Sequence, residues 1–419
     1  MRIWLITAGE LLPTDGNIRL FRYGILANFL AEQQEHHDII RWAPTFVHAT
    51  KRQRFGEDTE IRVNKRYKIN FLYTPDYKNH IGVKRYLFHR KFAQRFSRNA
   101  SLEKKPDIIL CSMPIPELCI ESIIYGIKHN VPVIIDVRDV WPDALLHSFP
   151  IFLRRLIKIS LFPFKRKNKF IFKYATGIIG ITDGFLQWGL NHAKRDRGMF
   201  DSVFYMAYPR TKFSIDETRE AKTKWDARRV GIKQNKMRVC FFGSFVKLFD
   251  IEIIIKVAKQ LHKRKINNFQ FIICGDGPNY LKILEMSDDV PSILLPGWVT
   301  APEVEVLMER SAIGIIPYKR GVVTALPNKA VTYFSKGLPV ITSNEGEFSE
   351  IVTNRHCGVT YKVEDVDSLI EVLLALYNNK KMIQELSEGV NFLYENELNS
   401  DLVYGNMLKF LLKISKYKD

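Results

Sequence analysis

The sequence has few cysteines and no long hydrophobic run. Its 419 residues contain five cysteines, an odd number, with no Cys-x-x-Cys pair and no close cluster of cysteine and histidine. This pattern argues against a disulfide framework and a zinc site, and we expect buried free thiols in a reducing cytosol. No run of about 18 apolar residues occurs, so no membrane-spanning helix is predicted. The cysteines are Cys111, Cys119, Cys240, Cys274 and Cys357.

Acidic residues are scarce beside basic ones. There are 45 Asp and Glu against 63 Lys and Arg, a net charge of +18. Residues 1–210 hold 34 basic and 19 acidic side chains, whereas the rest of the chain holds 29 and 26. Such asymmetry indicates a surface for an anionic partner, namely a phosphorylated lipid, an acidic membrane or a nucleic acid. Because no zinc-finger, RRM or KH signature accompanies the charge, we expect no nucleic-acid partner.

Short apolar runs alternate with helical patterns along the chain, and 46% of the residues are hydrophobic. Apolar runs of four to eight residues separated by helices predict an α/β fold with parallel sheets. We expect Met1–Leu12 to hold a first strand and not a signal peptide, because its apolar run has one basic residue and ends at Glu10. Predicted strands include Ile3–Ile6, Asp107–Cys111, Val133–Asp136, Gly177–Ile181, Val239–Phe242, Phe271–Cys274, Ile313–Ile316 and Val340–Thr342.

The α/β pattern runs twice, with a polar, charged stretch between the two sets. We predict two Rossmann-like domains, 1–210 and 211–390, facing each other across a ligand cleft. Residues 391–419 are predicted to form a terminal helix that packs across the domains and returns to the first one.

Three motifs in the second half follow predicted strands and suit a diphosphate ligand. Small residues let backbone N–H groups approach an anion, and glycines permit a positive φ. Lys329 would oppose the helix dipole unless an anion lies there too. The alternative for each motif is an ordinary tight turn without a ligand. The motifs are Gly243-Ser244-Phe245-Val246-Lys247, Cys274-Gly275-Asp276-Gly277-Pro278 and Leu326-Pro327-Asn328-Lys329.

Three segments of the first half also carry polar or basic groups. Asp136–Pro142 places Arg138 and Asp139 after an apolar strand, which favours a polar cleft over a purely structural ion pair. Thr14–Arg22 follows the first strand, and its Gly16 and Asn17 offer backbone to an anion. Phe152–Tyr174 mixes aromatic and basic residues, as does a segment on anionic lipid; the alternative is a half-buried helix. Its basic residues include Arg154, Arg155, Lys158, Lys165, Arg166 and Lys167.

Taken together, these motifs resemble bacterial glycosyltransferases of family 4, which have the GT-B fold and build O-antigens and capsules. The resemblance covers nearly the whole chain through motifs in the family's order. They are Gly16-Asn17-x-Arg19-x-x-Arg22, Trp42–Arg54, Asp136-x-Arg138-Asp139-x-Trp141-Pro142, Gly180–Thr182 with Phe185, Trp188 and Gly189, Ala207–Pro209, Gly243-Ser244, Gly275–Gly277, Pro327–Lys329 and Gly337-x-Pro339.

The resemblance implies a retaining, metal-independent glycosyltransferase without a cofactor. Its substrates would be a nucleotide-sugar, UDP-linked as the resemblance implies, and a lipid-diphosphate-linked glycan at the inner face of the cell membrane. Lys247 and Lys329 would clamp the diphosphate, and Arg138 and Asp139 would stand near sugar and acceptor. The other implied donor residues are Gly16, Asn17, Gly243, Ser244, Gly275, Asp276, Gly277, Trp298, Leu326, Pro327 and Asn328.

One departure from the family pattern concerns two glutamates that usually contact the donor. Counting back from Gly337-x-Pro339, their places fall at Thr324 and Thr332. A hydroxyl still hydrogen-bonds a sugar, but a carboxylate does so more strongly. Glu345, Glu347 and Glu350 are nearby alternatives. Two other readings therefore stay open: a nucleotide-sugar epimerase of the same fold, and a catalytically weakened binding subunit.

Overall fold

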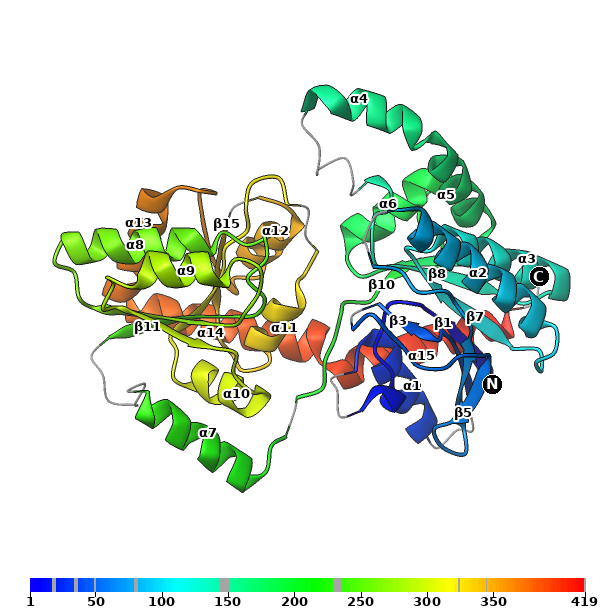
Figure 1. The fold of residues 1–419 in the computed structure, drawn as a ribbon, viewed down its shortest axis with the longest axis horizontal. Coiled ribbons are helices and arrows are strands. Elements are labelled where there is room, and N and C mark those ends of the chain that lie inside the picture. Colours follow the sequence, from blue (N-terminus) through cyan, green and yellow to red (C-terminus); the bar gives the residue numbers. More distant parts are fainter. Residues whose placement is uncertain are drawn as a thin grey trace. The chain divides into compact units, whose positions relative to one another are not determined.

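The chain folds into two compact units, each described here by itself (Figure 1). Unit 1 comprises Met1–Tyr208 and Ser400–Asp419, and unit 2 comprises Pro209–Asn399. The boundaries predicted from sequence followed residues 210 and 390; the second lies within a helix of unit 2. The computed structural model describes residues 1–16, 20–33, 37–48, 50–78, 82–143, 151–210, 212–228, 236–322, 325–343 and 345–417, without the side chains of 151, 152, 154, 155 and 158.

The described part of unit 1 contains an eight-stranded sheet of order β10-β9-β8-β7-β1-β2-β6-β5. All neighbours are parallel except β5, which runs antiparallel to β6 at the edge. The central strands are continuous apolar runs because both faces of the sheet are covered. Strands β3 (Phe46–Val47) and β4 (Arg52–Gln53) form a separate ribbon. The sheet strands are β1 (Arg2–Ile6), β2 (Asp38–Pro44), β5 (Thr59–Arg62), β6 (Tyr67–Leu72), β7 (Ile108–Ser112), β8 (Val133–Val137), β9 (Gly177–Gly180) and β10 (Ser202–Val203).

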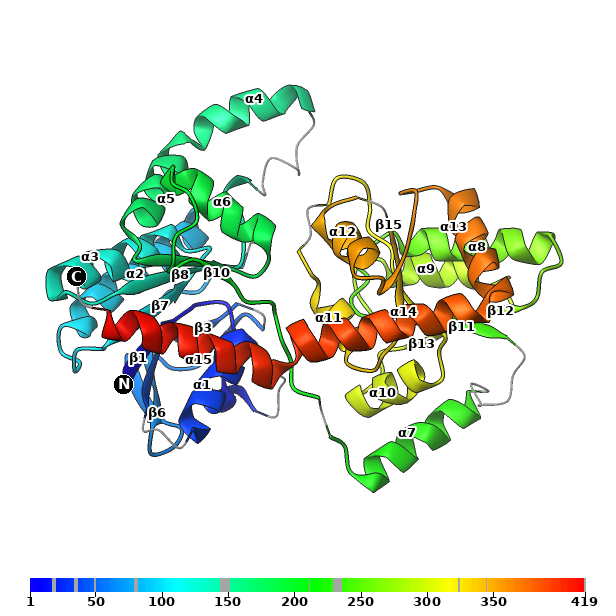
Figure 2. The same ribbon diagram turned by 180° about the vertical axis from the view of Figure 1, so that it is seen from behind.

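Helices cover both faces of this sheet. On one face, Tyr23 and Leu26 of α1 and Met407 and Leu411 of α15 share a core with the strands. Figure 2 shows α15 lying beside α1. On the other face, the buried Trp4 ring lies 6.1 Å from a ring of α2 and 4.9 Å from one of α3. The helices are η1 (Pro13–Asp15), α1 (Arg22–Glu32), α2 (Val83–Ala100), α3 (Pro116–His129), α4 (Ile151–Ser160), α5 (Phe162–Tyr174), α6 (Asp183–Ala193) and α15 (Ser400–Lys416).

Unit 2 contains a parallel sheet of order β13-β12-β11-β14-β15-β16. The order reverses between β11 and β14, and ligands of open α/β sheets bind at the carboxyl ends of the strands beside such a reversal. The strands are β11 (Met237–Phe242), β12 (Phe269–Cys274), β13 (Ile293–Gly297), β14 (Ile313–Ile316), β15 (Val340–Ser343) and β16 (Gly358–Tyr361).

Local sequence explains where several helices of unit 2 begin and which face they cover. Ser214 and Glu217 form a reciprocal capping box at the start of α7. Helices α8 and α13 pack on one face of the sheet in an Ile- and Leu-rich core, whereas Tyr333 of α11 covers Gly314 on the other. The helices are α7 (Ile215–Ala227), α8 (Ile251–Lys263), α9 (Tyr280–Ser287), α10 (Ala301–Glu309), α11 (Asn328–Phe334), α12 (Glu347–Asn354), α13 (Val366–Asn378), α14 (Lys380–Leu393) and the π-helical turn η3 (Tyr394–Leu398).

The predicted class, α/β with two parallel Rossmann-like sheets, is confirmed. Within residues 391–419, predicted as one terminal helix that returns to the first domain, Ser400–Lys416 form α15, which belongs to unit 1. The residues before it end α14 and form η3 in unit 2. Within the described ranges, none of the helices combines the length and apolarity needed to cross a membrane.

Candidate functional site

The loops that follow β11 and β12 pack so closely that only glycine fits at two positions. Gly243 has φ 134° and Gly275 has φ 143°. A Cβ atom built on Gly275 would lie 1.9 Å from the carbonyl oxygen of Gly243. The N–H group of Gly243 donates to the Cys274 carbonyl over 3.0 Å, and that of Phe245 donates to Asp276 over 2.8 Å. Two of the predicted motifs therefore form one rigid double loop.

Lys329 brings the third motif to the same place. Its Nζ atom lies 3.4 Å from the ring centre of Phe241 and 3.9 Å from that of Phe249. A Cβ atom on Gly243 would lie 3.2 Å from this Nζ. The Nζ atom is buried, and among the described residues it has no hydrogen-bond partner. Burial lowers the pKa of Lys329 well below its ordinary value.

Hydrogen bonds and a ring contact join the loop after β11 to the loop after β14. These are the two strands between which the strand order reverses. The Asp250 N–H donates to the Pro317 carbonyl over 2.7 Å, and the Lys319 N–H donates to Leu248 over 3.2 Å. The Phe249 ring stacks on Tyr318 at 5.2 Å. These contacts fix one of the two rings that hold the Lys329 ammonium, so the cation is preorganised beside the double loop.

The other predicted donor residues surround this centre or lie at its margin. Ser244, Lys247 and Asp276 are exposed. Leu326 is buried, Pro327 caps α11, and Asn328 begins it. Trp298 is 72% exposed after β13 and makes no ring contact among the described residues. Gly277 has φ 149°, and its N–H donates to the Asp276 carboxylate over 2.7 Å.

The positions of the two missing glutamates are only partly described. Thr324 lies outside the described residues. The Thr332 hydroxyl donates to the carbonyl of Asn328 within α11, over 3.0 Å. Glu345 accepts the N–H of Gly321 over 3.0 Å and pairs with Arg320 at 3.3 Å. Glu345 thus ties down the loop after β14, and Glu347 and Glu350 lie in α12.

In unit 1, Arg138 forms an ion pair with Glu10. The sequence alone identified Glu10 only as the end of an apolar run. The buried Glu10 carboxylate binds Arg138 at 2.5 Å and Arg41 at 2.7 Å. It also accepts the backbone N–H of Tyr23 over 3.2 Å. Burial alone would raise the pKa of Glu10, but the charges of Arg138 and Arg41 outweigh it and lower that pKa. A charged residue breaking an otherwise apolar strand end was the available signal.

Asp139 directly follows Arg138 on the loop after β8. Burial raises the pKa of the Asp139 carboxyl, against the opposing charge of Arg85. The preceding Asp136 is fully buried and pairs with Arg22 at 3.0 Å. Gly16, with φ 106°, is exposed beyond η1, and Asn17 lies outside the described residues.

The segment 152–174 forms α4 and α5. Leu156, Ile159 and Phe162 are 66%, 72% and 60% exposed. Lys167 pairs with Glu117 at 2.5 Å and Lys165 with Asp143 at 3.4 Å, whereas Arg166 is exposed. The side chains of Arg154, Arg155 and Lys158 lie outside the described set.

Comparison with known proteins covers the site in unit 2 most directly. Residues 236–379 match the family model described as glycosyl transferases group 1. An uncharacterised glycosyltransferase of Methanocaldococcus jannaschii is 28% identical over 151 residues, 36% of this chain and 40% of that protein. A chitobiosyldiphosphodolichol beta-mannosyltransferase of Debaryomyces hansenii is 23% identical over 179 residues, 38% of each protein. The chain thus spans about two fifths of the length of each of these relatives.

Solved structures match the whole chain. Anabaena Alr3699/HepE in complex with UDP superposes with a TM-score of 0.66 at 11% identity, covering 98% of this chain and 99% of that one. WaaG, a glycosyltransferase involved in lipopolysaccharide biosynthesis, gives 0.59 at 12% identity, covering 97% and 98%. The chain has the GT-B fold. At these identities the solved structures establish the fold alone.

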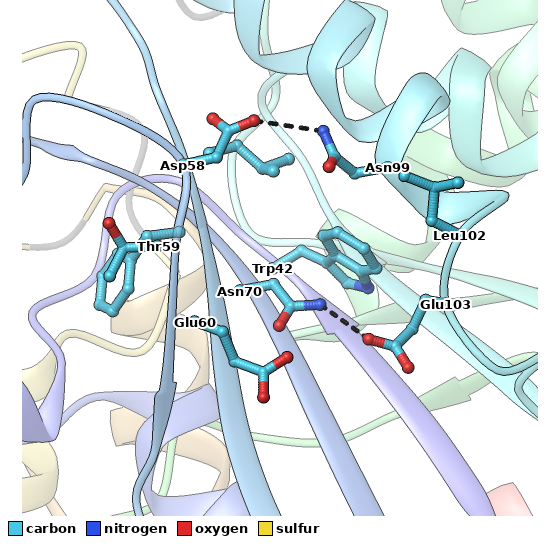
Figure 3. Close-up of a pocket in the computed structure, with 10 residues that line it drawn as sticks. Trp42, Asp58, Thr59, Glu60, Asn70, Asn99, Leu102 and Glu103 are labelled. Carbon is cyan, nitrogen blue, oxygen red and sulfur yellow. Dashed lines mark hydrogen bonds between the residues drawn. The ribbon is translucent and has the colours of Figure 1, made fainter.

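One pocket of this GT-B chain holds none of the predicted site residues (Figure 3). It has a volume of about 240 Å³ and lies in unit 1 between β5, β6 and the end of α2. Its acidic groups are matched by neighbours: Asp58 pairs with Arg95 at 2.6 Å, and Glu103 pairs with Lys68 at 2.6 Å. Asn99 and Asn70 each donate to one of these carboxylates (Figure 3). The lining residues are Trp42, Asp58, Thr59, Glu60, Asn70, Phe71, Leu72, Asn99, Leu102 and Glu103.

Proposed function

We propose that the protein is a glycosyltransferase that takes a sugar from a UDP-linked donor bound by unit 2. The observation that carries this proposal is the buried Nζ atom of Lys329, which lacks a hydrogen-bond partner among the described residues and lies against Gly243. An uncompensated buried cation is costly, and an anionic ligand would supply the missing charge. The group 1 family match spans this site, and the similar HepE structure is a UDP complex. Both support a nucleotide diphosphate as that anion.

The chemistry follows from where charge develops. When the bond between sugar and diphosphate breaks, negative charge accumulates on the departing diphosphate. The Lys329 ammonium, with Lys247 on the adjacent loop, stabilises that charge, and preorganised groups do so without reorganisation at the moment of reaction. We propose that this replaces a metal ion and that the sugar keeps its anomeric configuration, as in the family 4 enzymes the chain resembles. The departing phosphate would then accept the proton of the acceptor.

For the acceptor, we propose a lipid-diphosphate-linked glycan of surface polysaccharide synthesis, of the O-antigen or capsule type. Three features support a membrane-associated acceptor: the basic excess of residues 1–210, the exposed apolar groups of α4 and α5, and the similarity to a protein named for a diphosphodolichol substrate. WaaG, of lipopolysaccharide biosynthesis, has the same fold. The protein would act peripherally at the inner face of the cell membrane.

The test is ligand-induced thermal stabilisation by UDP and a panel of nucleotide-sugars. The wild type is compared with Lys329→Met, which keeps the contacts with Phe241 and Phe249 but removes the charge. Lys263→Met, on an exposed position of α8, is the control. A ligand at a hundred times its Kd stabilises the native state by about 2.7 kcal/mol. We expect UDP compounds to stabilise the wild type and the control but not Lys329→Met. Equal stabilisation of all three would contradict the assignment of Lys329.

The retaining, metal-independent reaction is tested on the products. NMR of the product formed from an α-linked donor should show an α-linkage, and turnover should survive EDTA. A β-linked product, or loss of turnover that Mg²⁺ or Mn²⁺ restores, would contradict this part of the proposal.

Thr332 favours a second candidate, a binding subunit with weakened catalysis. Its hydroxyl is already engaged within α11, where the family pattern has a carboxylate. One assay distinguishes the enzyme from the binding subunit. Donor binding without transfer to any lipid-linked acceptor would support the subunit, and transfer would support the enzyme.

A further inference from the structure

The pocket of Figure 3 lies over the antiparallel edge of the unit 1 sheet, beside the end of α2. The strand register places Trp42 of β2 opposite Asn70 of β6, and Asn70 opposite Glu60 of β5. Residues in register on neighbouring strands point to the same face of a sheet, so these three side chains share one face. The strands therefore bring an indole, an amide and a carboxylate together in one pocket.

Two buried polar atoms of opposite character lack hydrogen-bond partners in this pocket. Trp42 is 1% exposed, and among the described residues neither its Nε1 atom nor the Oδ1 atom of Asn70 has a partner. The Asn70 NH2 group donates to the Glu103 carboxylate over 3.2 Å, which fixes the end of the amide that carries the oxygen. The indole N–H only donates, and the amide oxygen only accepts. Because such groups are costly to bury without partners, a ligand that both donates and accepts would stabilise them.

Two carboxylates of the pocket are held in fixed positions. Asp58 accepts the backbone N–H of Tyr73 over 2.6 Å and pairs with Arg95 at 2.6 Å. Glu103 accepts from the Lys68 ammonium over 2.6 Å. Burial alone would raise the pKa of Glu103, but hydrogen bonds, that from Lys68 foremost, outweigh burial and lower that pKa. Glu103 is therefore ionised near neutral pH, and hydrogen bonds to an ionised acceptor are the strong ones.

The charge and the size of the pocket restrict what can bind in it. An anion would be repelled by the carboxylates of Asp58, Glu60 and Glu103. Within the described ranges, no group of three His, Cys, Asp or Glu side chains is placed to hold a metal ion. The volume of about 240 Å³ is below the roughly 300–1,000 Å³ of pockets for drug-sized ligands. These properties favour a small, neutral ligand that carries several hydroxyl groups.

We propose that this pocket binds one neutral sugar ring. A hydroxyl group both donates and accepts, so neighbouring hydroxyls of one ring would accept from Trp42 and donate to Asn70 and to the carboxylates. The C–H groups of the ring would cover Leu102, which is 85% exposed. Because the protein groups are fixed, a rigid ring loses less freedom on binding than a flexible polyol. The site lies outside the donor site of unit 2 and goes beyond the proposed function, on which it does not rest.

The experiment follows the indole N–H resonances of the full chain by NMR. The six tryptophans are labelled with ¹⁵N, and spectra are recorded with increasing methyl glycosides of glucose, galactose, mannose and N-acetylglucosamine. UDP is present throughout to occupy the donor site. Trp42→Phe and Trp4→Phe each remove one resonance and so assign it. Trp4 is the matched control, because its Nε1 atom also lacks a partner among the described residues and its ring packs 5.2 Å from that of Trp42, but it does not line the pocket.

We expect at least one glycoside to shift the Trp42 resonance in a saturable manner, and to shift it more than the Trp4 resonance. Asn70→Leu should weaken this binding about tenfold, because it removes the amide and keeps the side-chain volume. Asn191→Leu, at an exposed position of α6, is the control and should bind as the wild type does. The absence of a saturable Trp42 shift with all four glycosides, or equal affinity of Asn70→Leu and the wild type, would overturn the proposal.

A matched pair of ligands tests the charge of the pocket without any substitution. Each glycoside that binds is compared with the methyl glycoside of its uronic acid, which adds a carboxylate to the same ring. We expect the uronic acid to bind more weakly because of Asp58, Glu60 and Glu103, and equal affinity would contradict the proposed site. The unfolding temperature shows whether Asn70→Leu is folded. Its stabilisation by UDP should equal that of the wild type, so failure of this site is distinguishable from failure of the donor site.

Discussion

At the scale of single residues, Lys329 is where burial and function conflict. Burial lowers its pKa, and the aromatic rings of Phe241 and Phe249 compensate only part of the lost hydration. A hydrophobic residue would suit the apo protein better. The binding of an anion therefore explains why this buried position holds a lysine.

This conflict predicts proton uptake on binding. In free protein the Lys329 pKa is lowered, and a bound diphosphate raises it again, so at pH values between these two pKa values UDP binding takes up protons. Calorimetry in two buffers of different ionisation enthalpy measures this uptake, repeated at increasing pH up to about 9. We expect uptake in the wild type and in Lys263→Met. Uptake that does not vary with pH would contradict the pKa shift.

The same shift has a consequence for stability. The pKa of Lys329 in the folded protein lies below its unfolded value of about 10.4. Between these two pKa values the unfolded state binds more protons than the folded state, so the free energy of unfolding rises with pH in that range. Lys329→Met lacks this contribution. Its free energy of unfolding should therefore equal or exceed that of the wild type at neutral pH and depend less on pH, as chemical denaturation across that range would show.

The double loop makes a second residue-scale prediction. Gly275→Ala adds a Cβ atom 1.9 Å from the Gly243 carbonyl oxygen at a φ of 143°. We expect unit 2 to lose about 3 kcal/mol of stability and UDP binding to weaken, because the loop beside Lys329 must shift. Gly56→Ala, with open space around its Cβ, is the control and should change stability by less than about 0.5 kcal/mol. Denaturant titration measures both variants, and an unperturbed Gly275→Ala would disprove the close packing.

At the scale of elements, α15 shows how a terminal helix completes a distant core. Met407, Tyr404 and Leu411 are fully buried against the strands of unit 1. The Tyr404 hydroxyl donates to the carbonyl of Ala207 over 3.0 Å. The sheet of unit 1 thus depends on residues from the far end of the chain.

Met407→Ala should therefore destabilise unit 1 by about 2–5 kcal/mol through the cavity it leaves. The UDP-induced stabilisation of unit 2 should persist. Lys409→Ala, exposed on the same helix, is the control. Hydrogen exchange of unit 1 strand peptides reports the loss; if exchange speeds up in unit 2 instead, the assignment of α15 to unit 1 is wrong.

At the scale of the whole molecule, charge is distributed unequally. Most of the +18 net charge lies in residues 1–210, whereas the remainder is close to balanced. The exposed apolar groups of α4 and α5 belong to the same part of the sequence. The combination suits an anionic lipid surface, because apolar burial and charge attraction add.

Phe162→Ser tests this surface. Removing one 60% exposed aromatic group that would insert into lipid should weaken binding to phosphatidylglycerol vesicles about tenfold. Leu281→Ser, at a 77% exposed position in unit 2, should leave binding unchanged. Sedimentation measures both variants, and wild-type binding should fall with rising salt. Equal effects of the two substitutions would rule out a specific role for α5.

The sequence by itself determined the α/β class and most of the strand positions. The strand predicted at Ile313–Ile316 has the bounds that the structure shows. The strand predicted at Val133–Asp136 is one residue longer in the structure and ends at Val137. Apolar runs of this length in alternation with helices have few other stable arrangements. The role of the glycines after β11 and β12 was also predictable from sequence, because a positive φ and close approach restrict the residue type at those positions.

Only the tertiary structure decided which side chains meet. The contact of Lys329 with Phe241 and Phe249, the pairing of Glu10 with Arg138, and the joining of His48 to Tyr77 bring together residues far apart in sequence. Periodicity reports which face of an element is buried, but partners across the sheet follow from strand order and packing. For the same reason only the structure shows that the predicted terminal helix begins at Ser400, after the π-helical turn η3 of unit 2.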